Sequence, residues 1–225
     1  MNRKIYGAWT SHTDQRDPSY NEMLRGRARV FRDRMNWNVD VIDGKEFDLY
    51  DRIGDPLYLI SLNDTGNVVG SLRVLPTTGP TMLKNDFASM FREPVDIESP
   101  TVWECTRFCV HAGPDDTMPK PRNIALQLLC GLCDLAHEFN IEGIVGVYEL
   151  PMQAVYKRLG WSPRLISISW PRFGKISCGM WDVNPTIRDH LCNRVKTCGL
   201  ETLAFQYSLQ NDKSVRKNPR ISRVG

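Results

Sequence analysis

The run Thr101-Val-Trp-Glu-Cys-Thr-Arg-Phe-Cys-Val-His111 decides how the sheet of this protein is arranged. Its β-branched and aromatic residues predict a strand. Side chains alternate between the two faces of a strand, so an ideal strand would turn Glu104 and Arg107 to opposite faces. Either one of them faces a structural partner, or a β-bulge near Cys105 and Thr106 turns both toward one pocket. The sequence leaves both arrangements open.

The segments on either side of this run alternate between strand-like and helix-like patterns. Before it, residues 57–62 and 68–75 are β-rich runs joined by an Asn-Asp-Thr-Gly-Asn turn, which predicts a hairpin. Apolar spacing predicts helices over residues 20–35 and 82–91, a loop and long helix over 119–139, and helices over 151–159 and 185–197; further strands are expected over 143–148, 165–170 and 175–181. This order predicts a single α/β domain with a mixed, mainly antiparallel sheet flanked by helices.

Length and composition fit one folded domain. The chain has 225 residues, of which 41% are apolar and 24% charged, as in ordinary globular proteins. No apolar run approaches the roughly 20 residues that span a bilayer, and no apolar signal core follows the start of the sequence. We therefore expect a cytoplasmic protein without a membrane span.

The last fifteen residues account for the net positive charge of the chain. They contain five Lys or Arg residues against one acid, Asp212, which gives +4, whereas the whole chain has +3 and the remainder therefore −1. Residues 1–210 predict the folded domain and residues 211–225 a basic, disordered tail. The alternative is an arm that binds nucleic acid, but no DNA-binding motif stands elsewhere, and we expect no nucleic-acid partner.

Seven cysteines and four histidines are scattered along the chain. An odd number of cysteines without a dense framework indicates reduced thiols. Cys130 and Cys133 form a C-x-x-C motif, but they fall inside a predicted helix, which favours core packing over redox or metal chemistry. The histidines are isolated from one another and from paired cysteines. We predict no metal site and no bound cofactor.

Charged and aromatic residues form an ordered set in the first half of the chain. Arg27 and Phe31 stand four residues apart, on one face of a predicted helix. Trp37 and the acidic string Glu46-Phe-Asp-Leu-Tyr-Asp51 follow, and Arg73 comes near the end of its strand. The set closes with Glu104, Arg107 and Phe108.

Each feature taken alone has a simpler explanation. Arg27 can be a surface arginine whose stem covers the core, and Asp48 and Asp51 can be solvated turn acids. Arg73 and Glu104 can form a surface ion pair. Trp37 is expected to be partly buried in either case. The order of the whole set is therefore more informative than any member.

This ordered set resembles the acyl-homoserine-lactone synthases, the autoinducer synthases of bacterial quorum sensing. The family's Arg-x3-Phe followed by Trp stands here as Arg27, Phe31 and Trp37. Its acidic pair stands as Asp48 and Asp51, its strand arginine as Arg73, and its Glu-x-x-Arg-Phe as Glu104, Arg107 and Phe108. The second half of the chain matches more loosely, through the loop and helix after His111 and through residues 151–161.

The resemblance implies a GNAT-like N-acyltransferase fold and two substrates, S-adenosylmethionine and an acyl thioester of acyl carrier protein (acyl-ACP) or coenzyme A (acyl-CoA). The amine of the methionine part attacks the thioester to form an amide, and the carboxylate then closes the homoserine lactone with release of methylthioadenosine. By resemblance, the catalytic residues are Glu104, Arg107 and Arg73, and the substrate-binding residues are Arg27, Phe31, Trp37, Asp48, Asp51, Phe108 and Gly146.

The charges of these residues agree with that substrate. A sulfonium suits the aromatic faces of Trp37 and Phe31, an ammonium suits Asp48 or Asp51, and a carboxylate suits Arg27 or Arg107. The reference pKa of an α-amino group is roughly 7.7–8.0, so Glu104 can serve as the base, directly or through water. Backbone amides freed by the bulge are candidates to stabilise the oxyanion.

The acyl donor is expected in the gap between the strands that begin near residues 101 and 143, beside Lys120, Arg122 and the amides that open the next helix. Gly146 stands where many family members that make 3-oxo products carry Thr, which favours an unsubstituted, branched or aromatic acyl group. Lys157 and Arg158 either contact an acidic carrier protein or form a solvated helix face. Candidates for the apolar acyl pocket are Leu126, Val145, Val147, Tyr148, Met152 and Val155.

Two other functions stay open at this level. A different GNAT-like N-acyltransferase would carry a Gly-rich pyrophosphate loop before its long helix, whereas residues 111–123 contain only Gly113 and three prolines. A non-enzymatic module that binds nucleic acid or a partner through its basic tail would have no need for the ordered set from Trp37 to Arg107.

Overall fold

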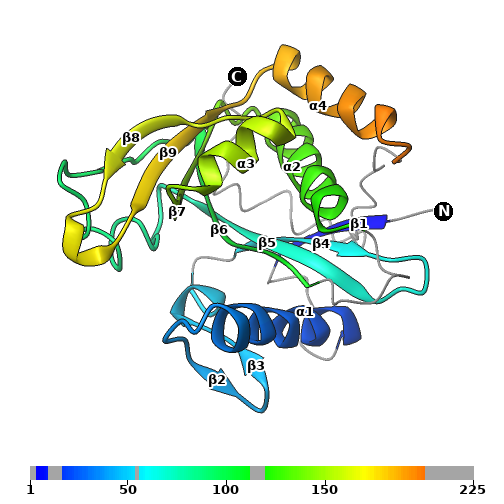
Figure 1. The fold of residues 1–225 in the computed structure, drawn as a ribbon, viewed down its shortest axis with the longest axis horizontal. Coiled ribbons are helices and arrows are strands. Elements are labelled where there is room, and N and C mark those ends of the chain that lie inside the picture. The colour runs from blue at the N-terminus through cyan, green and yellow to red at the C-terminus, as the bar shows by residue number, and fades with distance from the viewer. Residues whose placement is uncertain (1–3, 10–16, 54–55, 112–119, 201–225) are drawn as a thin grey trace, which may run out of the picture.

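The computed structural model describes residues 4–9, 17–53, 56–111 and 120–200. Its centre is a twisted seven-stranded sheet with the order β1-β4-β5-β6-β7-β9-β8 (Figure 1). Only β6 and β7 pair in parallel, and the other neighbours are antiparallel, which confirms the predicted mixed α/β architecture. The strands are β1 (Lys4–Trp9), β4 (Leu57–Leu62), β5 (Val68–Pro76), β6 (Val102–Val110), β7 (Gly143–Glu149), β8 (Arg164–Ile168) and β9 (Ile176–Asp182).

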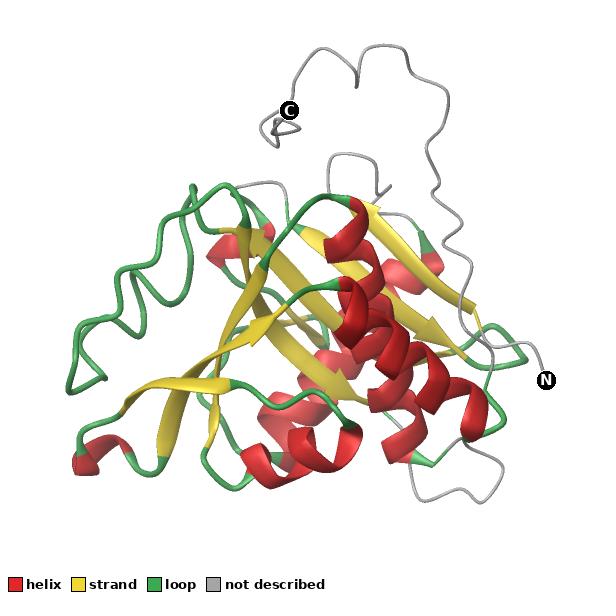
Figure 2. Cartoon of the chain, turned by 90° about the horizontal axis from the view of Figure 1, so that it is seen from above, coloured by secondary structure: helices red, strands yellow, loops and turns green. Residues whose placement is uncertain are grey.

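Helices cover both faces of the sheet. In Figure 1, α1 lies on one face, and α2, α3 and α4 lie on the other; Figure 2 shows from above how the helices lie across the strands. The α-helices are α1 (Pro18–Ala28), α2 (Pro121–Glu138), α3 (Met152–Leu159) and α4 (Pro185–Thr197). Shorter elements are the π-helical η2 (Arg29–Arg34), the 3₁₀ turns η3 (Leu49–Asp51) and η4 (Pro171–Phe173), and a small hairpin of β2 (Val41–Ile42) and β3 (Lys45–Glu46).

Strand β4 shows how alternation along the sequence builds two apolar layers. Leu57 and Leu59 pack into the main core beneath α2. Tyr58 and Ile60 point to the opposite face and pack against Met23 of α1. Every residue of β4 is buried, as expected for a strand covered on both sides.

The ends of the last two helices follow the signals in the sequence. Gly160 ends α3 with a left-handed φ of 97°, a conformation that glycine adopts without steric strain. At the start of α4, the Asn184 side chain accepts a hydrogen bond from the Ile187 amide, and Pro185 occupies the first helical position. The predicted bounds of α4 are therefore confirmed.

Four expectations need correction or lie outside the structure. Residues 82–91 form turns and a bridge instead of a helix: the Phe87 amide donates to the Met82 carbonyl five residues earlier and the Met90 amide to the Phe87 carbonyl three residues earlier, which is not the ladder of an α-helix. The predicted helix over residues 20–35 divides into α1 and η2, and the short strands β1, β2 and β3 were not predicted. The proposed boundary at residue 210 and the basic tail lie outside the described residues.

Strands β6 and β7 separate soon after they begin. They pair from Val102–Gly143 through Glu104–Val145, while β7 continues to pair with β9 as far as Glu149. Beyond Glu104 the two strands therefore form a fork, in agreement with the gap expected from the sequence. Among the described helices, none combines the length and the hydropathy that crossing a bilayer requires.

Candidate active site

The predicted charged residues meet on the α1 side of the sheet. Arg27 points from α1 toward the strands and is 1% exposed. Its Nη1 and Nη2 donate to the two carboxylate oxygens of Asp51, each at 2.9 Å, and its Nε donates to Glu46 Oε2 at 2.5 Å. The explanation of Arg27 as a snorkelling surface residue is therefore wrong. Bidentate pairing fixes the orientation of both partners.

Arg73 of β5 extends the network along the sheet. Its Nη1 donates to Asp51 Oδ1 at 2.8 Å and to Asp48 Oδ1 at 2.5 Å, and its Nη2 donates to Asp48 Oδ2 at 2.9 Å. Its Nε donates to Thr106 Oγ1 of β6 at 3.0 Å. Asp51 thus holds Arg27 and Arg73 together, and Tyr58 also donates its hydroxyl to Asp51 Oδ1 at 2.5 Å.

Arg107 closes the network into a ring. Its Nη2 lies 2.8 Å from Asp48 Oδ2 and 3.0 Å from Glu46 Oε1. Positive and negative side chains therefore alternate around a closed charge ring, whose members in order are Arg27, Asp51, Arg73, Asp48, Arg107 and Glu46. Arg107 and Asp48 are its most accessible members, with side chains 10% and 17% exposed, while the other four are at most 1% exposed.

The acidic string builds its part of the charge ring locally. Asp48 caps η3 by accepting hydrogen bonds from the amides of Tyr50 and Asp51, and the Asp51 carboxylate accepts one from the Asp48 amide. This reciprocal capping box brings two carboxylates three residues apart onto one side of a single turn. Asp51 is 3% exposed, so the explanation of it as a solvated turn acid is wrong.

A β-bulge brings Glu104 and Arg107 to the same face. Between the Ser71–Cys109 and Arg73–Thr106 pairs, Leu72 of β5 opposes both Arg107 and Phe108 of β6. Arg107 adopts a left-handed φ of 52°, which is unusual for a residue with a side chain. Of the two predicted arrangements, the β-bulge is therefore confirmed. The extra residue lies slightly later in the strand than Cys105 and Thr106.

Glu104 is buried beside the charge ring but is held by backbone amides. It is 1% exposed, and its two oxygens accept hydrogen bonds from the amides of Met82 at 3.0 Å and Leu83 at 2.8 Å. Burial raises the pKa of Glu104 to about 7, against the opposing effect of these amides and of Arg73. The explanation of Arg73 and Glu104 as a surface ion pair is wrong, because both are buried.

Met82 connects Glu104 to the charge ring. Its amide donates to Glu104, while its sulfur lies 3.4 Å from Arg73 Nη2 and 3.3 Å from Arg107 Nη1. The loop after β5 therefore fixes the position of Glu104 relative to the arginines.

Two aromatic side chains flank the accessible side of the charge ring. Phe31 and Trp37 stack with centroids 5.1 Å apart and an interplanar angle of 17°, and the Arg107 guanidinium lies 5.5 Å from the Phe31 centroid. Phe31 is buried, but Trp37 is 42% exposed. Trp37 is thus partly buried, as expected, because its Phe31 side is covered. An exposed indole face beside a charged network can receive a cation or a flat ring.

Electrostatics keep the buried members of the charge ring ionised. Burial alone would raise the pKa of Asp51, but Arg27 and Arg73 hold it well below its usual range. Burial would lower the pKa of Arg27, yet Asp51 and Glu46 raise it well above its ordinary value. The pKa of Tyr58 is raised by burial and by Asp51, so its hydroxyl stays a donor. The ring is electrically balanced and preorganised.

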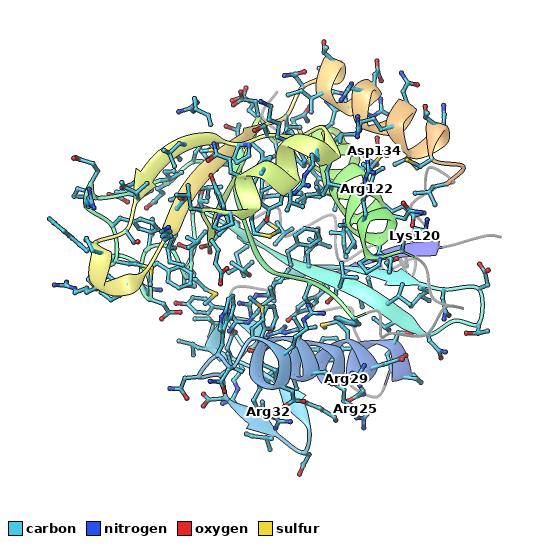
Figure 3. All side chains as sticks on the ribbon, in the orientation of Figure 1. Arg25, Arg29, Arg32, Lys120, Arg122 and Asp134 are labelled. Carbon is cyan, nitrogen blue, oxygen red and sulfur yellow. The ribbon has the colours of Figure 1, made fainter. Side chains whose placement is uncertain are left out.

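The remaining predicted residues lie elsewhere. Phe108 packs against the main core with α2, and is not part of the charge ring. Gly146 lies on β7 directly beyond the last β6–β7 pair. Lys120 and Arg122 are exposed at the start of α2, whereas Arg25, Arg29 and Arg32 lie on the outward side of α1 and η2 (Figure 3). Within the described ranges, no group of three or more His, Cys, Asp or Glu side chains is arranged to hold a metal ion.

The predicted acyl-pocket residues do not form one cluster. Val145 and Val147 pack with Leu83 and Phe91. Leu126, Tyr148, Met152 and Val155 belong to or pack against the main core on the other face of the sheet. The six candidates therefore lie on both faces of the sheet.

Sequence reasoning missed four residues of the site. Glu46 was identified only as part of the acidic string. Three arginines faced only two carboxylates, those of Asp48 and Asp51, and the positive charge left without a partner was a signal for a third carboxylate. Thr106 was located near the bulge but not as the partner of Arg73. Tyr58 and Met82 had no signal, because both are ordinary members of apolar runs until the fold brings them to the site.

Comparison with known proteins gives one consistent result. The sequence profile of a family described as autoinducer synthase matches residues 11–175. An acyl-homoserine-lactone synthase from Rhizobium etli is 53% identical over 171 residues, which cover 76% of this chain and 79% of that protein. An acyl-homoserine-lactone synthase from Agrobacterium fabrum is 33% identical over 149 residues, covering 64% of this chain and 68% of that protein.

Solved structures agree with the expected GNAT-like fold. The acyl-homoserine-lactone synthase LasI matches with a TM-score of 0.74 and 26% identity, over 85% of this chain and 95% of its own. BjaI, described as a CoA-dependent acyl-homoserine-lactone synthase with SAM and isopentyl-CoA, matches with a TM-score of 0.77 and 20% identity, over 91% and 93% of the two chains. At that identity, the likeness to BjaI is one of fold.

Proposed function

This chain belongs to the autoinducer synthase family and is an acyl-homoserine-lactone synthase, an acyltransferase that makes a quorum-sensing signal; we propose that its substrates are S-adenosylmethionine and an acyl thioester, and that Glu104 is its base. Family membership sets aside a different N-acyltransferase and a non-enzymatic module. No separate cofactor enters the proposal, because S-adenosylmethionine is consumed as a substrate.

The charge ring offers S-adenosylmethionine its two accessible members. Arg107 and Asp48 lie side by side, so the substrate carboxylate can pair with Arg107 and its ammonium with Asp48. The Phe31–Trp37 stack beside Arg107 suits the sulfonium or the adenine ring. Arg27, Asp51 and Arg73 are buried and fully engaged, and act here as residues that position the other two.

Glu104 is the group with the properties of a general base. A base works best when its pKa lies near the operating pH, and burial raises the pKa of Glu104 to about 7. An ordinary glutamate has a pKa near 4.5 and would take a proton from an ammonium far less readily. The buried position of Glu104 beside the charge ring is the single observation that carries the mechanism.

The reaction then proceeds in two balanced steps. Glu104 accepts a proton from the ammonium, directly or through water, and the freed amine attacks the thioester carbonyl. The carbon–sulfur bond of the thioester breaks, the sulfur takes up the proton that the attacking nitrogen loses, the thiol leaves, and an amide remains. A carboxylate oxygen of the same substrate attacks the γ carbon, whose bond to the sulfonium sulfur breaks, so that methylthioadenosine leaves and the lactone closes.

The fork between β6 and β7 is the proposed place for the thioester. Its base is the Glu104–Val145 pair, so a thioester entering the fork brings its carbonyl carbon toward Glu104. Holding both reactants in this geometry supplies much of the rate.

Incubation of the purified protein with S-adenosylmethionine and matched panels of acyl-CoA and acyl-ACP thioesters tests this proposal. We expect methylthioadenosine release, measured together with the mass of an acyl-homoserine lactone. Methylthioadenosine release without formation of an acyl-homoserine lactone would contradict the proposed substrates. The same holds if the folded protein releases no methylthioadenosine with any thioester of either panel.

A further inference from the structure

Helices α2 and α4 bring a pair of thiols together. α4 packs against α2 (Figure 1). Cys130 of α2 and Cys192 of α4 have their sulfur atoms 3.6 Å apart, and one turn further along α2 the Asp134 carboxylate pairs with Arg188 of α4. The second pair lies four residues later on α2 and four residues earlier on α4, so the two helices run antiparallel in a fixed register. All seven cysteines are free thiols in this structure.

The contact between Cys130 and Cys192 is close to the geometry of a disulfide. In the reduced protein it is a thiol–thiol hydrogen bond, in which either sulfur can be the donor. A disulfide bond is about 2.05 Å long, so each sulfur has to move by less than about 1 Å toward the other. Each sulfur turns about a single side-chain torsion, while the helical backbones on both sides stay in place. No rearrangement of the fold is needed to join them.

The two thiols differ in their access to solvent. Cys130 is 5% exposed, and burial together with Cys192 raises the pKa of its thiol above the usual range. Cys192 is partly exposed on α4. Cysteine oxidation follows accessibility, so Cys192 is the thiol that a small oxidant meets first. Cys130 lies directly behind it, where a resolving cysteine would stand.

We propose that Cys130 and Cys192 are an oxidation site of this protein, at which a hydroperoxide converts the two thiols into a disulfide that joins α4 to α2. The inference goes beyond the proposed acyl transfer and does not depend on it, because neither thiol belongs to the charge ring. It also extends the sequence analysis, in which the C-x-x-C spacing drew attention to Cys133. The partner that the fold gives Cys130 comes from a different helix, 62 residues later.

The oxidation proceeds in two balanced steps. The Cys192 sulfur, as it loses its proton, attacks one oxygen of the peroxide; the O–O bond breaks, a sulfenic acid forms, and an alcohol leaves, or water if the oxidant is hydrogen peroxide. The Cys130 sulfur then attacks the sulfenic sulfur, whose S–O bond breaks, and water leaves with the Cys130 proton. The two thiols lose two electrons, and the peroxide gains them.

The disulfide is expected to stabilise the fold. It closes a loop between residues 62 positions apart, and a crosslink over a long loop restricts the unfolded chain more than the folded one. The oxidised protein should therefore unfold at a temperature about 5 °C or more above that of the reduced protein. Dithiothreitol should reverse the shift.

Treatment of the reduced full-length protein with equimolar hydrogen peroxide tests the proposal. After the remaining thiols are blocked with N-ethylmaleimide, we expect two of the seven thiols to escape labelling. Peptide mapping without reductant, with fragmentation of the linked peptides, should find Cys130 joined to Cys192. Seven labelled thiols, a link through Cys133, or an unchanged unfolding temperature in the linked protein would overturn the proposal.

Cys130→Ser separates the chemistry from packing. With no thiol behind it, the sulfenic acid of Cys192 should persist after peroxide and be trapped by dimedone, whereas Cys192→Ser should give neither adduct nor link. Cys198→Ser is the matched control, because it removes an exposed thiol just after α4. It should keep the link between Cys130 and Cys192. Absence of the dimedone adduct in folded Cys130→Ser, or loss of the link in Cys198→Ser, would remove the assigned roles.

Discussion

The two sides of the sheet treat their polar groups in opposite ways. On the α1 side, six charged side chains form a closed ring in which each has partners on both sides. On the α2 side, the described residues Tyr148, Ser177 and Gln127 have buried polar atoms with no hydrogen-bond partner. A fully paired network holds its geometry before the substrate arrives, whereas an unpaired group lowers stability until something else satisfies it. The charge ring therefore holds its residues in position, whereas each unpaired group on the α2 side lowers the free energy of unfolding.

The largest effect is expected from Glu104→Gln, which changes the carboxylate buried beside the charge ring. The amide keeps the shape of the side chain but cannot accept the substrate proton, so we expect methylthioadenosine release to fall by about 10² to 10⁴. Binding of S-adenosylmethionine, measured by calorimetry, should stay near the wild-type level, because Asp48 and Arg107 are unchanged. Wild-type turnover in this variant would remove Glu104 from the role of base.

The same residue has a predicted pH signature. The folded protein holds the Glu104 proton up to about pH 7, whereas the usual pKa is 4.5, so the folded state binds more protons between these values. Stability from this group is therefore present below pH 4.5 and is lost as the pH rises to about 7. Glu104→Gln should lack this loss in urea unfolding measured across that range, while wild-type turnover should rise through about pH 7.

Asp51→Asn breaks the charge ring at its most connected member. Asp51 pairs with both Arg27 and Arg73, and the variant leaves two buried guanidinium groups with too little negative charge. Removing one partner of a buried pair typically lowers the free energy of unfolding by about 3–5 kcal/mol. Urea unfolding at neutral pH measures the change. As a control, Asp33→Asn removes the exposed partner of Arg32 and should leave stability unchanged.

Local patterns in the sequence were enough for much of the fold. The bounds of β4 and α4 follow from apolar patterning and from the Asn184-Pro185 start signal, and each side chain needs only its near neighbours to satisfy it. The capping box between Asp48 and Asp51 is equally local. The alternation of side chains along the strand showed that Arg107 required either a bulge or a structural partner. It did not decide between the two.

The missed features depend on contacts between distant parts of the chain. Glu46 gains its place in the charge ring from Arg27 and from Arg107, which stands 61 residues later. The turn at Met82 is held by Glu104, more than twenty residues away, which accepts hydrogen bonds from the Met82 and Leu83 amides. The stack of Trp37 on Phe31 is a further contact that no periodic pattern indicates.

His111 lies on the α1 side but, unlike the charge ring, has a buried polar atom without a partner among the described residues. Its titration therefore gives a further test of the difference between the two sides. Its Nε2 lies 3.1 Å from the Cys109 sulfur and 3.3 Å from the Ser71 hydroxyl, but its buried Nδ1 has no partner among the described residues. Burial, together with Arg29, Arg27 and Arg34, lowers the pKa of His111 from 6.5 to about 3.

This lowered pKa predicts a loss of stability in acid. The unfolded chain takes up the His111 proton first, so the stabilising effect is present above pH 6.5 and is lost as the pH falls toward about 3. The loss is at most about 1.4 kcal/mol per pH unit for one proton. His111→Asn should flatten this part of the stability profile measured by urea unfolding. An unchanged acid slope in that variant would assign the proton uptake to other groups.

The smallest effect is expected from Gln127→Met, which tests how much one unpaired buried group on the α2 side lowers the free energy of unfolding. Gln127 is 1% exposed, and neither its amide nitrogen nor its amide oxygen has a hydrogen-bond partner in the described part of the chain. Met is unbranched, similar in length and able to fill irregular space, so it removes the polar atoms while keeping the packing. We expect the free energy of unfolding to rise by about 1 kcal/mol, because an unsatisfied buried group is removed. Gln153→Met on the less buried α3 should leave it unchanged. A loss of stability in Gln127→Met would mean that its amide has partners in solution, and the contrast between the two sides of the sheet would then be confined to Tyr148 and Ser177.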